Sequence, residues 1–230
     1  MKKIVIVGGF LTSPETYANL ARLLTKTPYN ALVEIANISP ADWLLGAFDK
    51  GVRMIEKIDE AVQKICDGTK GKAVVIAHSA GGILSRVYLT DKPYRGHCFD
   101  GHERVETLIT LGTPHKGRIA GFVERRYPGA YCSPQVSYIA LAGKSIKGKV
   151  KGSMREHVAY RVYRGLQGRG DTWGDGLVPT ESAKLTGAAN ATLPFVTHNL
   201  YLSEHWYGSE GALNNWGHNL LQNERLSNTN

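Results

Sequence analysis

The sequence has few cysteines and no long apolar run. Its three cysteines, Cys66, Cys98 and Cys132, are odd in number and widely spaced, which argues against a disulfide framework and favours a reducing compartment. The apolar run near the N-terminus is interrupted by Gly8 and Gly9 and is too short for a secretory signal. No other run reaches the length of a membrane span. We therefore expect a soluble, cytoplasmic protein.

The sequence also lacks internal repeats and low-complexity segments, which excludes repeat architectures. Its 230 residues are 42% hydrophobic and 21% charged, the ordinary composition of a soluble globular protein. A chain of this length suits one domain and is long enough to bury a substantial core. We expect a single domain that spans residues 1–230.

Acidic residues are outnumbered by basic ones, 20 against 28, which gives a formal net charge of +8. The densest basic stretch holds Lys144, Lys147, Lys149 and Lys151. Such an excess attracts anionic partners, so peripheral contact with an anionic membrane is one interpretation and a merely solvated surface is the other. Basic and aromatic residues are not interleaved as in a nucleic-acid groove, and we expect no nucleic-acid partner. The sequence gives no indication of the oligomeric state.

Strand and helix patterns alternate along the chain. Short β-branched or apolar runs predict six strands, and KAVVIA (residues 72–77) is the clearest buried one. Since parallel neighbours need crossover connections, the alternation predicts an α/β fold with about six mostly parallel strands and helices on both faces. The expected strands are residues 3–7, 31–38, 72–77, 105–111, 136–142 and 191–197. Four helices are expected. The first starts after Ser13, the second runs from Asp49 to about Cys66, the third follows Gly82, and the last runs from about Ser209 to Leu221.

Ligands of such sheets bind at the carboxyl ends of the strands, and a serine stands at one of these ends. The segment AHSAGG (residues 77–82) follows the clearest strand and precedes a helical pattern. Small residues are needed around Ser79 because a tight turn brings the backbone close to the neighbouring strand and helix. Ala77 replaces the first glycine of the common G-x-S-x-G pattern and is still small. The context favours a nucleophile at Ser79 over a structural turn.

Four segments resemble lipase-like α/β-hydrolases, in the order that this family has them. They are HSAGGILSRVYL (78–89), TLITLGTPHKG (107–117), GDGLVPTESAKLTGA (174–188) and the run from His198 to Ser209. The last run is most similar to a subgroup from photosynthetic lineages that is related to the GPI-inositol-deacylase-like lipases. The resemblance spans most of the chain. It implies hydrolysis of carboxylic esters, often of lipids, without a cofactor.

A serine hydroxyl is a weak nucleophile and needs a base that is oriented by a carboxylate. In this fold the order along the chain is serine, acid, histidine. We predict Asp175 as the acid, because Gly174 and Gly176 permit a sharp turn that aims the carboxylate inward. The alternatives are a loop aspartate that caps its own turn, or Asp171 as the acid.

The sequence offers eight histidines for the base. His78 is adjacent to the serine and projects differently, so packing near the turn is expected. We predict His198 as the base because it follows the last expected strand, and His205 is the rival. The remaining histidines lie before the acid, apart from one in the terminal helix; they are His97, His102, His115, His157 and His218.

The loop after the first expected strand is the candidate for part of an oxyanion hole. Gly8 and Gly9 let the backbone approach an ester, and the N–H of Phe10 would donate to the oxyanion together with the N–H of Ala80. The same glycines do not continue into G-x-G-x-x-G, which argues against a dinucleotide site. We expect no cofactor.

Three further groups of residues carry weaker signals. Thr113-Pro114-His115 follows the fourth expected strand and fits a structural turn better than a catalytic element. His97, Cys98, Asp100 and His102 are of types that bind zinc, but their spacing defines no tetrahedral site, so we expect no metal. Four aromatic residues in connecting segments either line an acyl pocket or pack in the ordinary way; they are Tyr94, Tyr127, Tyr131 and Trp173.

Together these features predict an esterase or lipase that acts through an acyl-enzyme on Ser79, with His198 and Asp175. An acyltransferase or thioesterase would use the same residues with another acceptor or ester. A non-catalytic binding module on the same fold is a further alternative. The segment of residues 144–170 is long enough to cover the candidate site.

Overall fold

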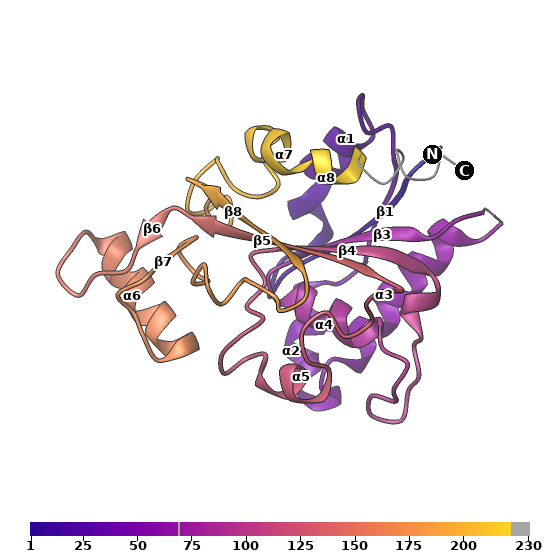
Figure 1. Cartoon of the computed structure of the whole chain (residues 1–230), viewed down its shortest axis with the longest axis horizontal. Helices are drawn as coiled ribbons and strands as arrows, with labels where there is room; N and C mark the ends of the chain where they lie inside the picture. The colour runs from indigo at the N-terminus through magenta and orange to yellow at the C-terminus, as the bar shows by residue number, and fades with distance from the viewer. Residues whose placement is uncertain (69, 222–230) are drawn as a thin grey trace.

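A parallel six-stranded sheet forms the centre of the computed structural model, which describes residues 1–68 and 70–221 (Figure 1). The strand order is β2-β1-β3-β4-β5-β8, and every neighbouring pair is parallel. The six-stranded α/β architecture predicted from the sequence is confirmed. The strands are β1 (Lys3–Val7), β2 (Leu32–Ile35), β3 (Ala73–His78), β4 (Val105–Leu111), β5 (Ser137–Lys144) and β8 (Ala189–Pro194).

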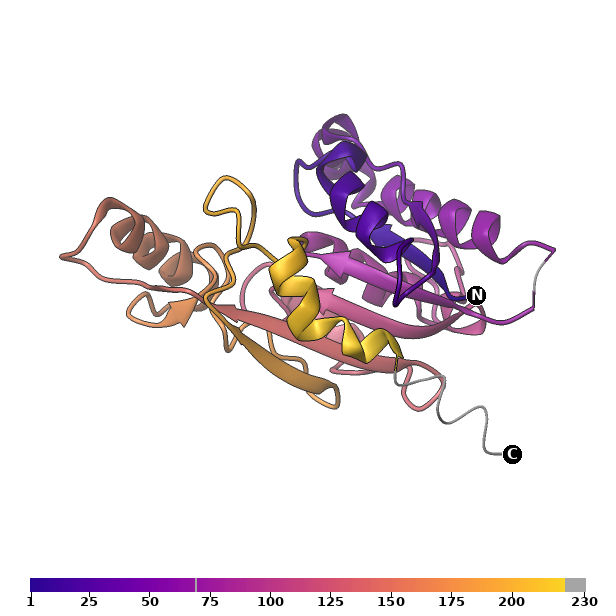
Figure 2. The ribbon, with the colours of Figure 1, turned by 90° about the horizontal axis from the view of Figure 1, so that it is seen from above.

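Alternate residues of the strands point to opposite faces, and each face has its own core. In β1, Ile4 and Ile6 pack against helices α1 (Ala18–Leu24), α7 (Glu210–Trp216) and α8 (His218–Leu221). Val5 and Val7 face the other core, which is covered by α3 (Val52–Cys66), α4 (Ala80–Tyr88) and α5 (Gly121–Arg126). Helices therefore cover both faces, as Figure 2 shows. Helix α2 (Pro40–Asp49) lies on the same side as α3, α4 and α5.

The expected helix from Asp49 is wrong at its start, because a separate helix, α2, ends at that residue. Lys50 and Gly51 have φ values of 56° and 87°, a left-handed conformation that stops α2 and redirects the chain into α3. A capping box between Ser39 and Asp42 starts α2. The helix expected after Ser13 begins as a 3₁₀ turn (Pro14–Tyr17) and continues as α1.

A lobe of residues 144–174 projects from the end of the sheet (Figures 1 and 2). It contains a two-stranded antiparallel ribbon, β6 (Ile146–Lys147) with β7 (Trp173–Gly174), and helix α6 (Met154–Gln167) between them. Ser153 and Glu156 form a capping box at the start of α6, and Gly168 ends it with a φ of 82°. Within the described residues, no helix is both long and apolar enough to cross a membrane.

Candidate active site

Ser79 lies in a strained turn between β3 and α4. Its φ of 51° and ψ of −129° are rare for a residue with a side chain, and such strain is commonly found at functional sites. A Cβ at Gly81 would lie 2.4 Å from the carbonyl oxygen of Gly8, and a Cβ at Gly82 would lie 2.1 Å from Oγ1 of Thr113. The small residues after Ser79 are therefore required by close packing.

The structure brings Ser79, His198 and Asp175 together, although they are far apart in the sequence. Nε2 of His198 is 2.9 Å from Oγ of Ser79, and Nδ1 of His198 is 2.8 Å from Oδ2 of Asp175. An ionised carboxylate only accepts hydrogen bonds, so Nδ1 is the donor. In the neutral imidazole, Nε2 is then an acceptor and faces the Ser79 hydroxyl. This arrangement is suited to removing a proton from the serine.

Asp175 is fully buried at the end of β7 and is held by four hydrogen bonds. Its Oδ1 accepts the N–H groups of Leu177 and Val178, and its Oδ2 accepts Nδ1–H of His198 and the hydroxyl of Tyr207. Gly176, with a φ of 106°, permits the turn that these bonds require. Four donors compensate for the burial of the carboxylate.

Tyr207 is a part of this site that the sequence analysis did not identify. Its hydroxyl donates to Asp175 at 3.0 Å and accepts the N–H of Gly143 at 2.6 Å, so it links the acid to the end of β5. Burial and the neighbouring Asp175 carboxylate raise the pKa of Tyr207 well above its usual value. The phenol therefore remains a donor. The sequence feature that could have indicated Tyr207 is its place beside Trp206 in the terminal Trp-Tyr-Gly-Ser segment.

A second buried network lies behind Ser79 and joins Tyr17 to His78. Nε2 of His78 is 2.9 Å from the backbone oxygen of His198, which only accepts, so Nε2 carries the proton. Nδ1 is then an acceptor for the Tyr17 hydroxyl at 2.8 Å, and the Tyr17 oxygen accepts the N–H of Gly9. Burial and nearby His198 hold the pKa of His78 well below its usual range, in keeping with a neutral ring. As expected, His78 packs and hydrogen-bonds near the turn, and none of its described hydrogen bonds reaches Oγ of Ser79.

The loop after β1 lies directly against the serine. A Cβ at Gly9 would lie 2.8 Å from Cβ of Ser79, so only glycine permits this approach. Phe10 and Ala80 both line the cavity beside Ser79, and Ala80 is the first residue of α4, where an N–H has no partner within the helix. Phe10 packs its ring edge-on against Trp43 at 5.6 Å. Donation of their N–H groups to an oxyanion remains a prediction.

The rival site residues lie elsewhere. Asp171 is exposed and binds Arg169 at 2.8 Å. His205 is half-buried and packs near Gly211, and none of its described hydrogen bonds reaches Ser79. The last strand ends at Pro194, earlier than expected, because Phe195 has a φ of 64°. His198 is therefore positioned by the segment after the strand, and its N–H donates to the backbone oxygen of Asp175.

His115 is fully buried, and its Nε2 lies 3.0 Å from Oγ1 of Thr110. Burial and the charge of Arg86 lower its pKa well below the usual range. Thr113 is also buried and packs against Gly82, which fits the structural turn expected for Thr113-Pro114-His115.

Two of the four residues of zinc-binding type, His97 and His102, are engaged in other contacts. His97 stacks on Phe99 and lies 3.7 Å from Glu56, whereas Nδ1 of His102 is within 3.1 Å of the Leu89 carbonyl oxygen. In the part of the chain that the structure describes, no group of three or more His, Cys, Asp or Glu side chains is placed to hold a metal ion.

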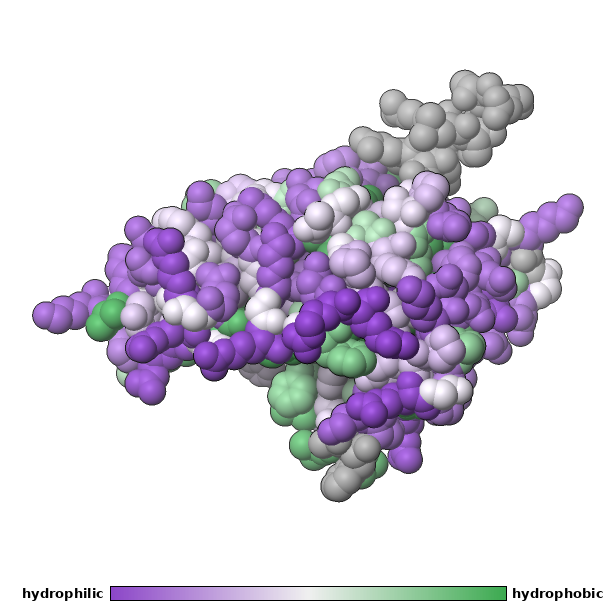
Figure 3. All heavy atoms as spheres, turned by 60° about the horizontal axis from the view of Figure 1, so that its bottom comes forward, coloured by the Kyte–Doolittle hydropathy of each residue, from purple (hydrophilic) through white to green (hydrophobic). Residues whose placement is uncertain are grey.

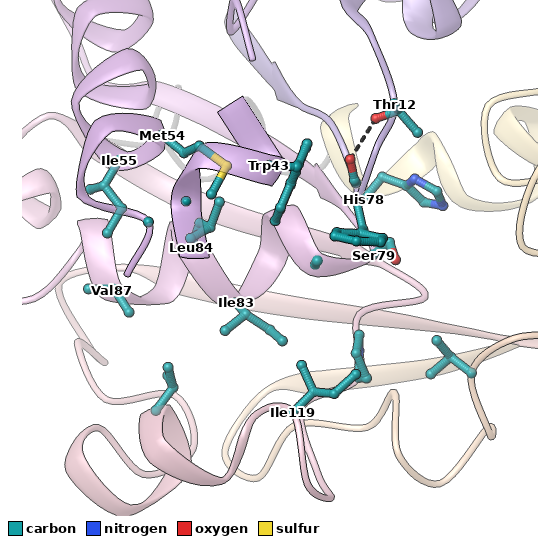
Figure 4. A pocket seen from close by; sticks show the side chains of 18 of the residues that line it. Thr12, Trp43, Met54, Ile55, His78, Ser79, Ile83, Leu84, Val87 and Ile119 are labelled. Carbon is teal, nitrogen blue, oxygen red and sulfur yellow. Dashed lines mark hydrogen bonds between the residues drawn. The ribbon is translucent and has the colours of Figure 1, made fainter. Parts of the chain in front are cut away.

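An apolar cavity of about 910 Å³ extends from Ser79 along α4 (Figure 4). Ser79 and His78 lie at one end, Trp43 and Ile83 in the middle, and Ile55 and Val87 at the other end. Most of the wall is aliphatic or aromatic, and α2, α3, α4 and α6 all contribute to it.

Of the four aromatic residues named from the sequence, only Tyr94 lines this cavity. Tyr127 is buried in the core and packs against Tyr131, and the Trp173 ring lies under Lys144. For these three residues ordinary packing is the better description.

Comparisons with known proteins agree with this architecture. A family model described as the PGAP1-like alpha/beta domain matches residues 49–126, which include Ser79. A search of curated protein sequences gave no significant match. The chain is similar to the mature form of lipase BlEst2 from Bacillus licheniformis, with 20% identity and a TM-score of 0.58, over 86% of this chain and 84% of that chain.

Two further solved structures show the same likeness. Phospholipase PlaB from Legionella pneumophila is 15% identical with a TM-score of 0.52; the match covers 86% of this chain but only 54% of PlaB. The product of gene lin2722 from Listeria innocua is 12% identical with a TM-score of 0.53, over 94% of this chain and 92% of that chain. The chain has the α/β-hydrolase fold, so the resemblance inferred from its sequence is confirmed at the level of the fold. The resemblance to a photosynthetic subgroup stays a prediction.

Proposed function

We propose that this protein is a serine hydrolase that cleaves carboxylic esters. Ser79 is the nucleophile, His198 is the general base, and Asp175 orients the base. The observation that carries the proposal is the unbroken hydrogen-bond chain from Ser79 through His198 to Asp175, at one end of an apolar cavity. The PGAP1-like match around Ser79 and the lipase neighbours support the same class of reaction.

The reaction uses groups that already face one another. His198 accepts the Ser79 proton as Oγ attacks the ester carbonyl, and Asp175 stabilises the imidazolium. The N–H groups of Phe10 and Ala80 donate to the tetrahedral oxyanion. The imidazolium then protonates the leaving alcohol, and water releases the acyl group by the same route. This chemistry requires no cofactor.

The cavity favours a lipid or other acyl ester as the substrate. Ser79 and Val87 are eight residues apart along α4, so the apolar wall extends about 12 Å from the nucleophile at the rise of an α-helix. An apolar channel of that depth gains free energy from each methylene that it buries, up to the length of the channel. We therefore propose an acyl chain of medium length.

A panel of nitrophenyl esters tests the proposal. We expect kcat/KM to rise from acetate to octanoate and to fall at palmitate, because the longest chain exceeds the channel. Absence of turnover on every ester would contradict the proposed function. Adding an alcohol acceptor separates hydrolysis from acyl transfer: we expect free acid as the main product, and a predominant transferred ester would assign an acyltransferase.

A further inference from the structure

The lobe of residues 144–174 carries most of the net charge of the protein. It contains eight Lys or Arg and two acidic residues, a net charge of +6, whereas the whole chain has +8. All eight basic side chains are exposed. The end of the molecule that holds the lobe is predominantly hydrophilic in Figure 3. The basic excess that appears scattered in the sequence is therefore concentrated at one end of the fold.

Both acidic residues of the lobe are already paired within it. Glu156 binds Lys149, and Asp171 binds Arg169. Among the described residues, no carboxylate lies within salt-bridge distance of the other six cations of the lobe. These cations are Lys144, Lys147, Lys151, Arg155, Arg161 and Arg164. The lobe thus presents six uncompensated positive charges to an outside partner.

Helix α6 adds an apolar stripe to these charges. Met154, Val158, Val162 and Leu166 recur at a spacing of four residues, so they form a continuous row on the helix. Met154 and Val158 are 80% and 46% exposed, whereas Val162 and Leu166 line the cavity that begins at Ser79. The row therefore starts in solvent and ends inside the candidate active site.

Cations border the exposed half of this row. At 3.6 residues per turn, Arg155 and Arg161 project on opposite sides of the direction shared by Met154 and Val158. A helix with an exposed apolar stripe and flanking cations fits the interface of an anionic membrane, where the stripe enters the acyl region and the cations meet the head groups. Exposed aliphatic side chains gain nothing from stacking on bases, which disfavours a nucleic acid.

We propose that the lobe, through the N-terminal half of α6, docks the protein on an anionic lipid surface. Binding itself needs only Met154, Val158 and the uncompensated cations. Its purpose rests on the proposed function, since docking brings the Val162–Leu166 wall of the cavity next to the lipid. An acyl ester then reaches Ser79 along an apolar path rather than through water.

Co-sedimentation with vesicles of neutral phosphatidylcholine, with and without phosphatidylserine, tests the docking. Ser79→Ala is used as the background so that lipid turnover does not alter the vesicles. We expect binding to require phosphatidylserine and to weaken as salt shortens the Debye length from about 30 Å at 0.01 M to about 8 Å at 0.15 M. Equal binding to both vesicles, or none to either, would overturn the proposal.

Two sets of variants separate charge from insertion. Arg155→Gln, Arg161→Gln and Arg164→Gln together should weaken binding on the order of a hundredfold, because each cation near an anionic surface contributes roughly fivefold. Val158→Ser with Met154→Ser should weaken it about tenfold or more by removing buried apolar area. The matched control neutralises three exposed cations outside the lobe, with Arg22→Gln, Lys26→Gln and Lys70→Gln together. It should change vesicle binding little.

The same lobe variants, made with Ser79 intact, distinguish a failure of docking from a failure of the proposed function. We expect turnover of a soluble short ester to be unchanged, since none of the altered residues lines the cavity. Vesicle binding without ester turnover would leave the docking intact and reject the hydrolase. Ester turnover without vesicle binding, or tighter binding to single-stranded RNA than to the anionic vesicles, would reject the docking alone.

Discussion

The Tyr17 hydroxyl donates a hydrogen bond to Nδ1 of His78 at 2.8 Å, and this contact joins the loop after β1 to the turn that carries Ser79. The same hydroxyl oxygen accepts the N–H of Gly9, and His78 donates in turn to the backbone of His198. One buried chain of hydrogen bonds therefore connects the loop proposed for the oxyanion hole with the residue proposed as the base.

Replacing Tyr17 with Phe tests whether this chain positions the site. The change leaves Nδ1 of His78 and the N–H of Gly9 without a partner, so we expect a loss of about 1–3 kcal/mol of unfolding free energy. We also expect kcat on a short ester to fall while KM changes little, because the loop next to Ser79 is less well held. Urea unfolding and steady-state kinetics measure the two effects.

Tyr88→Phe is the matched control for that experiment. Its hydroxyl is also buried and donates to Asp59 at 3.0 Å, on the opposite side of the sheet from Tyr17. We expect a loss of stability without a loss of kcat. If both variants lose kcat equally, the effect on turnover reports general destabilisation and not positioning by Tyr17.

Tyr207→Phe removes one of the four donors to Asp175. A hydrogen bond to a charged group contributes about 1.5–3 kcal/mol, so we expect kcat to fall by about ten- to a hundredfold. KM should stay nearly constant, because Tyr207 does not line the cavity. A rise in KM with unchanged kcat would contradict the role of Tyr207 in holding the acid.

Acid should destabilise the fold through two buried histidines. Burial lowers the pKa of His78 and of His115 below the unfolded value of about 6.5, so the native state stays neutral while the unfolded state takes up protons. The contribution of these two histidines to the free energy of unfolding is complete above that pH. It is lost as the pH falls below that value, by up to about 1.4 kcal/mol per pH unit for each residue. Urea unfolding between about pH 7 and pH 5 measures the slope.

His115→Asn should reduce the slope of the unfolding free energy against pH by the contribution of one histidine, since only His78 then remains as a neutral buried histidine. An unchanged slope would show that His115 is protonated in the native protein.

His198 and His205 are separated by their effects on turnover. His198→Ala should lower kcat by about 10⁴-fold or more, as Ser79→Ala should, and the double variant should be little worse than either. His205→Ala should cost far less, because its described contacts do not reach Ser79. The opposite ranking would assign the base to His205.

The strands and the turn at Ser79 were predictable because their signals are local. β-branched runs mark buried strands, and the sequence AHSAGG contains the small residues that close packing around Ser79 demands. Helix α2 was missed, and the helix after it was expected to start at Asp49 instead of Val52, although Gly51 was a visible signal for the break. Helix α6 was also missed, although the Ser153–Glu156 capping box marks its start.

The contacts of the candidate site were less predictable, because they join residues that are distant in the sequence. Residue order indicated Asp175 and His198, and the structure places His198 beside Ser79 and Asp175 beside His198; their catalytic roles stay predictions. The Tyr17–His78 and Tyr207–Asp175 bonds span 61 and 32 residues, and no sequence spacing indicates them. The concentration of charge in the lobe likewise follows from the fold, which carries residues 144–174 away from the sheet.

The central claim is that Ser79 is an activated nucleophile, and covalent labelling by a fluorophosphonate tests it most directly. The reagent reacts with a serine only when a base removes its proton. We expect rapid modification of one residue, identified as Ser79 by peptide mass spectrometry, and its loss in Ser79→Ala and His198→Ala. Absence of labelling in the folded wild-type protein, or labelling of Ser79 at the same rate in His198→Ala, would contradict the account.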